Sequence, residues 1–328
     1  MPPPHSPLSP ALAQAVRVLR AGGLVALPTE TVYGLGADAA QVAAVERIFA
    51  TKDRPTSHPL IVHVARSEAM ARWAADVPSA ARVLAERFWP GPLTLVLRRG
   101  ARVPLAVTGG LDTVALRVPA HPLALALLEA FGGGIAAPSA NRFGSISPTT
   151  AQHVRDDLGD AVDFVLDGGP CAVGVESTIV DVTGEQPAIL RPGGVSREAM
   201  QAALGHDVPV RADVTVRAPG QHLTHYAPRA QVVLVEATAI PDTARALRAG
   251  GRRVGVLLPA EQSASFASDI TVLPVPSSLD DYAHALFTLL RAFDQQGCDV
   301  IVASVPPAMG IGLAIADRLQ RAAGPRTR

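Results

Sequence analysis

The stretch from Thr51 to Pro55, TKDRP, contains the only lysine of a 328-residue chain in which the other 28 of the 29 basic residues are arginine. A single lysine can persist by chance in a protein that otherwise favours arginine. A lysine is also retained where a site needs a compact charge on a flexible stem, which the planar guanidinium of arginine does not replace. The polar residues that accompany this stretch favour the second interpretation.

Polar side chains gather directly after the predicted buried strands of the N-terminal two-thirds of the chain. Ligands of α/β sheets bind outside the carboxyl ends of strands, so this placement predicts a binding site. The residues concerned are Thr29, Glu30, Thr31, His63, Arg117, Ser139, Asn141, Ser147, Glu176, Ser177, Thr178 and Arg191, together with Lys52, Arg54 and His58, which follow the next predicted helix.

Each of these residues has an ordinary structural interpretation when it is taken alone. Ser147 precedes a proline and could simply cap a helix, and a single histidine is more often structural than a ligand-binding residue. Taken together, however, several cations flank apolar strands, where an unpaired charge is costly to bury. An anionic ligand would remove that cost. The four cations are Lys52, Arg54, Arg117 and Arg191.

Standard nucleotide-binding motifs are absent from the sequence. There is no GxxxxGK[ST] and no GxGxxG between a strand and a helix, and Gly34-Leu35-Gly36 is predicted as a loop that leads into a helix. Lys52 and Arg54, two residues apart, instead suit a triphosphate cradle. Its hydroxyl and amide donors would be Ser139, Asn141 and Ser147. A site rich in cations and poor in general bases favours electrostatic and positional catalysis at a phosphoryl group.

Alternating strand and helix patterns predict two α/β domains. We expect a catalytic domain at 8–205, an interdomain linker or lid at 206–230, and a smaller parallel α/β domain at 231–328. Strands of the first domain are predicted at 24–28, 59–64, 93–98, 113–118, 135–141, 163–167, 177–182 and 188–192. Its helices are predicted after a Ser9-Pro10 cap and at 37–52, 67–89, 121–134, 147–158 and 196–205.

Bulk composition argues against several classes of protein. The formal net charge is zero and aromatic residues make up 4% of the chain, which does not suit a nucleic-acid binder that acts through bulk charge. Cys171 and Cys298 lack the spacing of a zinc site. The segment MPPPHSPLSP is unlike a signal peptide, and no apolar run approaches the roughly 20 residues of a membrane span. We therefore expect a cytoplasmic protein without membrane contact.

Seven ordered motifs give the chain a strong resemblance to a known family. They are PTETVYGLGADA, KDRPTSHPLIVHV, FWPGPLTLVL, TVALRVP, APSANRFGSISPT, GVESTIVDV and ILRPGG. Together they resemble the YrdC-like family, the threonylcarbamoyl-AMP synthases, and APGQHLTHYAP with GLAIADRLQRAA resembles its long two-domain form. The resemblance runs from about Ala11 to Ala323. It implies a twisted α/β domain around a large concave cleft, followed by a smaller Rossmann-like parallel α/β domain.

The resemblance also implies an activity and its partners. An L-threonylcarbamoyladenylate synthase, a nucleotidyltransferase, converts L-threonine, bicarbonate or CO2, and ATP into threonylcarbamoyl-AMP and pyrophosphate. Mg2+ would be bound through the phosphates, and no protein metal site is expected. A separate tRNA threonylcarbamoyl transferase would then modify the adenosine next to the anticodon. Whether this chain binds tRNA directly is left open.

The family's functional positions map onto this sequence through the same motifs. Lys52, Arg54, Ser139 and Asn141 match the characteristic catalytic set. The positions that hold threonine match Thr31, His63, Arg117, Ala137 and Ser177, with Arg117 on the carboxylate and Ala137 acting through its backbone. The ATP contacts match Arg54, His58, Thr113, Ser139, Ser147, Arg191 and, from the linker, Tyr226. His58 stands where the family commonly has asparagine.

Two other functions remain as alternatives at this point. A wide cationic cleft could hold an RNA backbone without catalysis, although the sequence has no recognised RNA-binding motif. A carbamoyl-transfer enzyme with a different acyl acceptor is the second, because YrdC-like modules also occur in hydrogenase maturation. The zinc-finger and acylphosphatase-like segments of those proteins are not found in this sequence.

Overall fold

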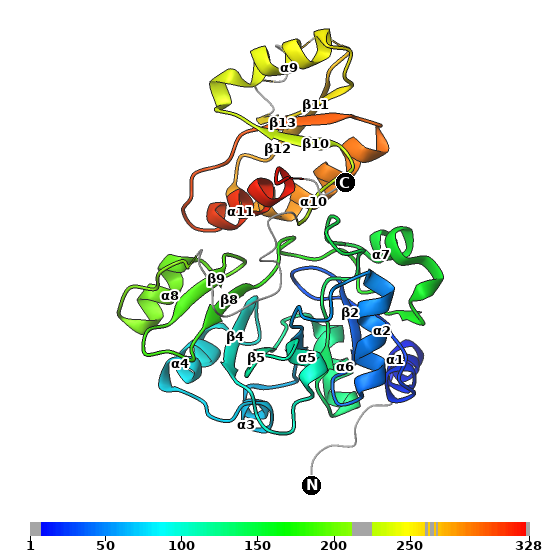
Figure 1. Ribbon diagram of the computed structural model, residues 1–328, viewed down its shortest axis with the longest axis vertical. Coiled ribbons are helices and arrows are strands. Elements are labelled where there is room, and N and C mark those ends of the chain that lie inside the picture. Colours follow the sequence, from blue (N-terminus) through cyan, green and yellow to red (C-terminus); the bar gives the residue numbers. More distant parts are fainter. Residues whose placement is uncertain (1–7, 212–224, 260–261, 263–265, 267, 326–328) are drawn as a thin grey trace.

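The structure, a computed structural model, describes residues 8–211, 225–259, 262, 266 and 268–325. A larger domain holds the N-terminal part of the chain, and a smaller domain holds the C-terminal part (Figure 1). Each has its own sheet, of nine and four strands in the described residues. No helix in these residues combines the length and apolar character that a membrane crossing needs.

The large sheet is mixed, in the order β7-β1-β2-β6-β3-β5-β4-β8-β9. β3 runs parallel to β5 and β4 parallel to β8, whereas β4 and β5 are antiparallel. β1 and β2 are also antiparallel because the loop between them is too short for a crossover helix. The strands are β1 (Val25–Leu27), β2 (Gly34–Asp38), β3 (Ile61–His63), β4 (Leu93–Arg98), β5 (Thr113–Arg117), β6 (Ile135–Ala136), β7 (Phe164–Val165), β8 (Thr178–Asp181) and β9 (Ala188–Arg191).

Helices cover this sheet unevenly. Side chains alternate between its faces, so Val25 and Leu27 join the cluster with α1 and α6, whereas Ala26 joins the main core with α2 and α4. Opposite the main core, β3, β4, β5, β8 and β9 carry a separate small apolar cluster. The helices are α1 (Pro10–Arg20), α2 (Val42–Lys52), η1 (Ser67–Ala69), α3 (Met70–Trp73), α4 (Ser79–Phe88), α5 (Leu105–Thr108), α6 (Pro122–Phe131), α7 (Ala151–Leu158), η2 (Gly159–Ala161) and α8 (Arg197–Leu204).

The prediction of a loop at Gly34-Leu35-Gly36 was wrong, because these residues begin strand β2. A Cβ on Gly36 would lie 2.7 Å from Leu27 and 2.8 Å from Ile135, side chains of the adjacent strands β1 and β6. Glycine is therefore needed for close packing between strands, which a single sequence does not distinguish from a glycine that serves a turn.

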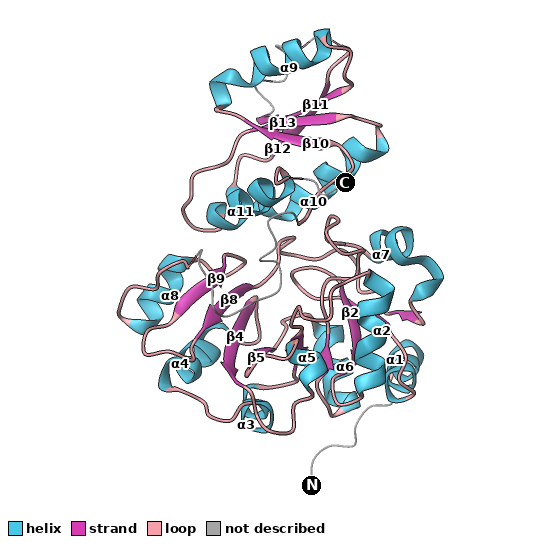
Figure 2. Ribbon diagram, in the orientation of Figure 1, coloured by secondary structure: helices cyan, strands magenta, loops and turns pink. Residues whose placement is uncertain are grey.

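The smaller domain has a parallel sheet in the order β10-β13-β11-β12, as predicted. Helix α9 covers one face, and α10 and α11 cover the other face, towards the larger domain (Figure 2). The elements are β10 (Gln231–Leu234), η3 (Ala237–Ala239), α9 (Ile240–Ala249), β11 (Val254–Pro259), β12 (Thr271–Val275), α10 (Leu279–Gln295), β13 (Val300–Ala303) and α11 (Gly312–Ala322). The predicted fold class, a YrdC-like α/β domain with a smaller parallel domain, is confirmed.

A shared hydrophobic core joins the two domains. Val32, Ile146 and Val175 of the larger domain pack in one cluster with buried residues of α10 and α11. Gly174 lies so close to α10 that a Cβ on it would meet the Cα of His284 at 2.5 Å. Most of the predicted linker, residues 212–224, lies outside the described residues, and the domain boundaries of the sequence analysis remain predictions.

Candidate active site

A partly open cavity, which spans about 520 Å³ when the solvent space at its mouth is counted, lies against the larger domain's sheet. The pairing of strands explains how distant residues meet there. The parallel register of β3 and β5 places His63 beside Arg117 at the carboxyl ends of both strands. Of the fourteen site residues mapped through the family's motifs, nine line the cavity, namely Thr31, Arg54, His63, Arg117, Ala137, Ser139, Ser177, Arg191 and Tyr226.

The other five predicted site residues lie outside this lining. Thr113 is on the same face as Arg117 but at the opposite end of β5, about 13 Å away at the usual rise per residue. His58 packs edge-on against Phe143, with ring centroids 5.4 Å apart. The remaining three, Lys52, Asn141 and Ser147, are buried behind the wall.

Lys52 is the last residue of α2 and only 1% exposed. Its Nζ donates to the backbone oxygen of Ser139 at 2.6 Å, to that of Asn141, and to Asn141 Oδ1 at 3.4 Å. Ser139 Oγ in turn donates to Asn141 Oδ1 at 2.6 Å. Burial, and then the charge of Arg54, lower the pKa of Lys52 well below its usual value. Through its hydrogen bonds to Ser139 and Asn141, the Lys52 side chain fixes the loop that presents Ser139 to the cavity.

Arg117 is not the unpaired cation that the sequence argument assumed. Its Nη2 lies 2.7 Å from Glu30 Oε1, and both side chains are largely buried. Its Nη1 donates to Thr31 Oγ1 at 2.9 Å, and its Nε donates to the Gly91 carbonyl at 3.3 Å. The loop after β1 thus fixes the guanidinium from one side, because Glu30 and Thr31 are neighbours in that loop.

Arg54 and Arg191 bring two more buried guanidinium groups to the cavity. Arg54 Nη2 donates to the Pro59 carbonyl at 3.0 Å, and burial lowers the pKa of Arg54 to about 10. Arg191 ends β9, and its Nη2 donates to the Ser177 carbonyl at 2.9 Å and to Ser177 Oγ at 3.2 Å. Ser177 Oγ is also 2.8 Å from Thr94 Oγ1 on the adjacent strand.

Several buried polar atoms at the cavity have no hydrogen-bond partner among the described residues. They include Arg54 Nε, His63 Nδ1 and the Tyr226 hydroxyl. Burial, and then the charge of Arg117, lower the pKa of His63 to about 3, so its ring is neutral near pH 7. Unsatisfied buried polar groups are costly. Their grouping at one cavity is the arrangement expected of a polar-ligand site.

Ser147 does not cap α7, although its Ser-Pro sequence suggested this. The cap is Thr150, whose side chain accepts from the His153 amide at 3.2 Å. Ser147 Oγ instead donates to Glu176 Oε1 at 2.5 Å. Glu176 lines the cavity, and its other carboxylate oxygen accepts from Arg318 of α11 at 2.7 Å.

Comparison with known proteins gives matches over nearly the whole chain. A family model described as "Telomere recombination", of the Sua5, YciO and YrdC group, matches residues 17–193. A second, described as "Threonylcarbamoyl-AMP synthase, C-terminal domain", matches residues 195–324. Threonylcarbamoyl-AMP synthases of Pyrococcus abyssi and Bacillus subtilis are 44% and 43% identical, over 95% and 97% of this chain and 94% of each relative.

A solved structure agrees with these matches. The crystal structure of P. abyssi Sua5 complexed with L-threonine has a TM-score of 0.90 and 43% identity, and the match covers 95% of this chain and 94% of that chain. The chain belongs to the threonylcarbamoyl-AMP synthase family. It is accordingly an enzyme of the nucleotidyltransferase type that forms threonylcarbamoyl-AMP. The family, fold class and activity predicted from the sequence are confirmed.

Sequence reasoning missed three residues at the site of this synthase. His225 lines the cavity, Thr94 supports Ser177, and Arg318 reaches Glu176 from the smaller domain. His225 directly precedes Tyr226, so its neighbour was a signal. Arg318 had a different signal, because it falls on the apolar stripe of an amphipathic helix with Ile315 and Leu319.

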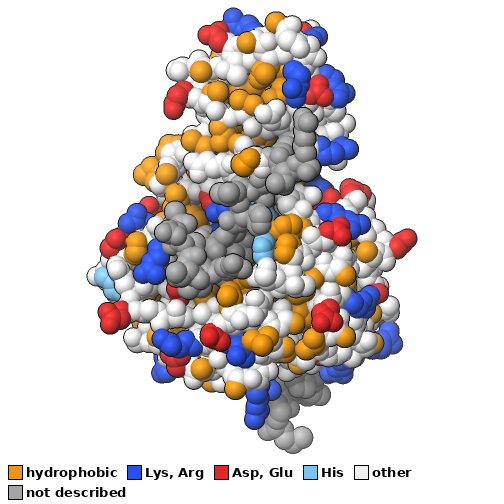
Figure 3. Space-filling model, in the orientation of Figure 1, with side chains coloured by type: hydrophobic (Ala, Val, Ile, Leu, Met, Phe, Trp, Pro, Cys, Tyr) orange, Lys and Arg blue, Asp and Glu red, His pale blue; other side chains and the backbone are white. Residues whose placement is uncertain are grey.

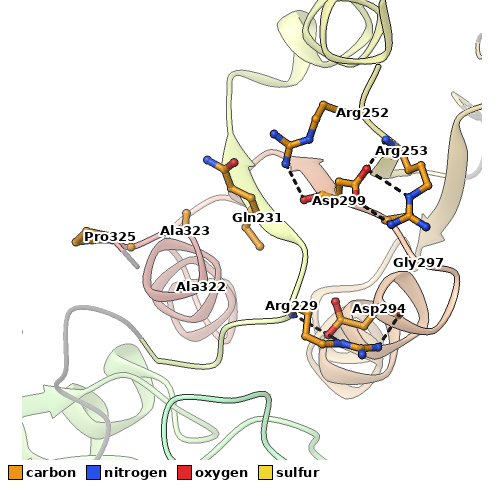
Figure 4. A pocket seen from close by; sticks show the side chains of 13 residues that line it. Arg229, Gln231, Arg252, Arg253, Asp294, Gly297, Asp299, Ala322, Ala323 and Pro325 are labelled. Atoms are coloured by element: carbon orange, nitrogen blue, oxygen red, sulfur yellow. Dashed lines mark hydrogen bonds and ion pairs between the residues drawn. The ribbon is translucent and has the colours of Figure 1, made fainter. Parts of the chain in front are cut away.

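A larger hollow in the synthase's second domain is a weaker candidate for the catalytic site (Figure 4). Its walls hold Arg253, which is ion-paired with Asp299 at 2.9 Å, and Arg229, which donates from its amide to Asp294 at 2.8 Å. It lies where β10, β11 and β13 begin, whereas ligands of parallel sheets bind beyond the carboxyl ends.

On the face shown in Figure 3, basic and acidic side chains are interspersed.

Proposed function

We propose that the cavity of the larger domain converts L-threonine, bicarbonate or CO2, and ATP into threonylcarbamoyl-AMP and pyrophosphate. The observation that carries this proposal is the convergence of Arg54, Arg117 and Arg191 on one cavity. All three guanidinium groups are buried, at 7%, 4% and 4% exposure. An amino acid and a polyphosphate are the anions that such a site would hold.

The threonine end of the site is assigned to the wall beside β3 and β5. Arg117 would bind the carboxylate in the orientation set by Glu30 and Thr31, which already hold two of its nitrogens. His63 is neutral and offers its unpaired Nδ1 to the substrate. The backbone of Ala137 and the hydroxyl of Ser177 complete this set.

The ATP end is assigned to the part of the lining that contains Arg54, Ser139 and Arg191. Arg54 and Arg191 would bind phosphate oxygens. Ser139, in the loop that Lys52 fastens, would redirect its hydroxyl proton from Asn141 Oδ1 to a phosphate oxygen. The remaining ATP contacts carried by the resemblance stay proposals, and they are His58, Thr113, Ser147 and Tyr226.

The reaction then follows from placing the two substrates together. The threonine amine attacks the carbon of bicarbonate or CO2 and becomes a carbamate, with loss of water when the carbon comes from bicarbonate and of a proton when it comes from CO2. A carbamate oxygen attacks the α-phosphorus of ATP in line, the bond to the bridging oxygen breaks, and pyrophosphate leaves. The guanidinium groups of Arg54 and Arg191 stabilise the growing charge. Both intermediate and product are labile in water, so a closed cavity preserves them.

Mg2+ is proposed as a companion of ATP. Glu176 lines the cavity and pairs with Arg318, whereas Glu30 lies outside the lining and pairs with Arg117. No cluster of three potential metal ligands occurs in the described residues. The donor set therefore suits an ion that arrives bound to phosphate oxygens and neutralises their charge.

The downstream steps are proposed on chemical grounds. Threonylcarbamoyl-AMP is a mixed anhydride, and a separate tRNA threonylcarbamoyl transferase must use it before water does. Its use in tRNA modification beside the anticodon supports a cytoplasmic location for this synthase.

Pyrophosphate release from ATP tests the assignment. We expect release only when threonine, bicarbonate and Mg2+ are all present. Arg117→Met should raise the KM for threonine about 100-fold, because a desolvated charge pair is lost. Arg66→Met is the matched control, since Arg66 forms an exposed pair with Glu129. Threonine-independent ATP cleavage with carbamoyl phosphate would contradict the proposal and favour a different acyl acceptor.

A further inference from the structure

Arg318 is an exception in the smaller domain. It is the one buried polar or charged side chain that the described residues of that domain contain, with 0% exposure. It lies on α11 between apolar residues that fill the shared core. Burying an arginine costs free energy that only strong partners offset.

Arg318 bonds mainly to residues that precede the smaller domain in the chain. Its Nε donates to Glu176 Oε2 at 2.7 Å, and its Nη1 donates to the Pro192 carbonyl at 3.1 Å. Its guanidinium lies over the Tyr226 ring, 4.8 Å from the centroid. Asp317, its neighbour on α11, forms a close ion pair with the same group.

These contacts place Arg318 directly behind the cavity wall. Glu176 and Tyr226 line the cavity, and Pro192 follows Arg191, which also lines it. Arg318 does not line it. A side chain of the second domain therefore contacts three elements of the cavity wall, although none of that domain's described residues lines the cavity itself.

We propose that Arg318 is a positioning residue by which the second domain completes the active site. It keeps the Glu176 carboxylate ionised and in place, and it holds the Tyr226 ring against the wall. Glu176 in turn orients Ser147, and the Pro192 contact fixes the end of β9 that carries Arg191. This inference rests on the proposed function of the cavity, because it assigns a role in that reaction.

The charges around Glu176 predict how Arg318 acts. Arg318 and then Arg191 lower the pKa of this buried carboxyl, Ser147 Oγ donates to it, and the Tyr226 ring stands beside it. Without Arg318, desolvation would dominate and raise the pKa of Glu176. Glu176 would then take up a proton at a higher pH than in the wild type, and the wall would lose its arrangement as the pH falls.

Arg318→Met tests the inference, with Arg291→Met as its matched control. Arg291 of α10 also pairs across the domains, in a partly buried ion pair with Asp157 at 2.6 Å. We expect Arg318→Met to lower kcat/KM for pyrophosphate release about 100-fold, because the wall residues shift. The acid limb of its pH profile should move to higher pH, whereas Arg291→Met should leave that limb unchanged. Identical profiles for the two variants would overturn the inference.

A double-variant cycle keeps the test decisive if Arg318→Met folds poorly. Glu176→Gln with Arg318→Met removes both charges, a replacement that buried pairs often tolerate. The double variant should lose less kcat/KM than the product of the two single losses, because part of the effect of Arg318 passes through Glu176. Independent, multiplying losses would refute that. A wild-type enzyme without threonine-dependent pyrophosphate release would instead refute the proposed function, so the two failures are distinguishable.

Discussion

The interiors of the two domains differ in kind. In the larger domain, buried cations, hydroxyls and carboxylates surround one cavity, and most of them bond to oxygens or to each other. In the smaller domain, Arg318 is the one buried charged side chain among the described residues, and it donates hydrogen bonds to Glu176 and Pro192 of the larger domain. The larger domain therefore contains the buried polar groups of the site, whereas the smaller domain contributes mainly apolar packing.

This difference separates two sources of free energy. Apolar packing is non-directional and tolerates exchange of similar side chains. A buried polar network depends on every partner, since one lost group leaves another unsatisfied. Perturbations of the polar interior should thus affect the rate most, and perturbations of the contact between domains should affect stability first.

Lys52→Met should break the polar interior most severely. Without the ammonium, the carbonyls of Ser139 and Asn141 lose their donor, and the loop that presents Ser139 shifts. We expect kcat/KM to fall about 100- to 1,000-fold. The free energy of unfolding should fall by about 2 kcal/mol. Pyrophosphate release and urea unfolding measure these effects.

Arg142→Met is the control for this variant. Arg142 contacts the same region, donating to the Thr51 carbonyl and to Asp53, but its side chain is 51% exposed. Its replacement should change the free energy of unfolding by less than about 0.5 kcal/mol. Equal losses in both variants would show that the ammonium of Lys52 has no special role.

Gly174→Ala should break the contact between the domains. Its φ of +81° disfavours any side chain, and the new Cβ would meet the backbone of His284 on α10 at 2.5 Å. We expect a loss of about 3 kcal/mol in the free energy of unfolding, measured by urea denaturation. Gly184→Ala is the matched control, because nothing lies within 4 Å of a Cβ at Gly184. A loss in both, or in neither, would contradict the tight packing at Gly174.

A pH titration of stability should give the smallest effect. The pKa of His63 is about 3 in the folded protein and about 6.5 when unfolded, so the unfolded chain binds the proton more readily. The contribution of His63 to stability therefore falls as the pH drops from about 6.5 towards about 3, and it does not change further at lower pH. His63 alone should contribute a loss of about 1 kcal/mol between pH 6.5 and 5.5.

Urea unfolding at these two pH values checks the titration. His63→Gln should remove this contribution, while replacement of the exposed His206 by Gln should not. A wild-type stability that does not fall between pH 6.5 and 5.5 would show that His63 is not held neutral.

Much of the fold followed from the sequence because its patterns are local. Alternating strands and helices of the second domain were predicted with its parallel sheet, and the Ser9 cap of α1 was found as expected. The strand at Gly34 and the short helix α5 were not predicted. Gly36 is there to admit Leu27 and Ile135, a long-range reason that no local pattern shows.

The site was predictable as a set of residues, but its bonds were not. The motifs brought nine of the expected residues to one cavity. They did not reveal that Arg117 is already paired with Glu30, or that Ser147 serves Glu176 rather than a helix end. These partners are 87 and 29 residues apart, so tertiary structure brings them together and spacing along the chain does not reveal them.

The core shared by Val32, Ile146 and Val175 with α10 and α11 limits how this enzyme can be shortened. A protein truncated after residue 205 would expose these three aliphatic side chains to water and would tend to aggregate. The design of a single-domain synthase must therefore replace these exposed apolar side chains by polar ones and provide another cation to pair with Glu176.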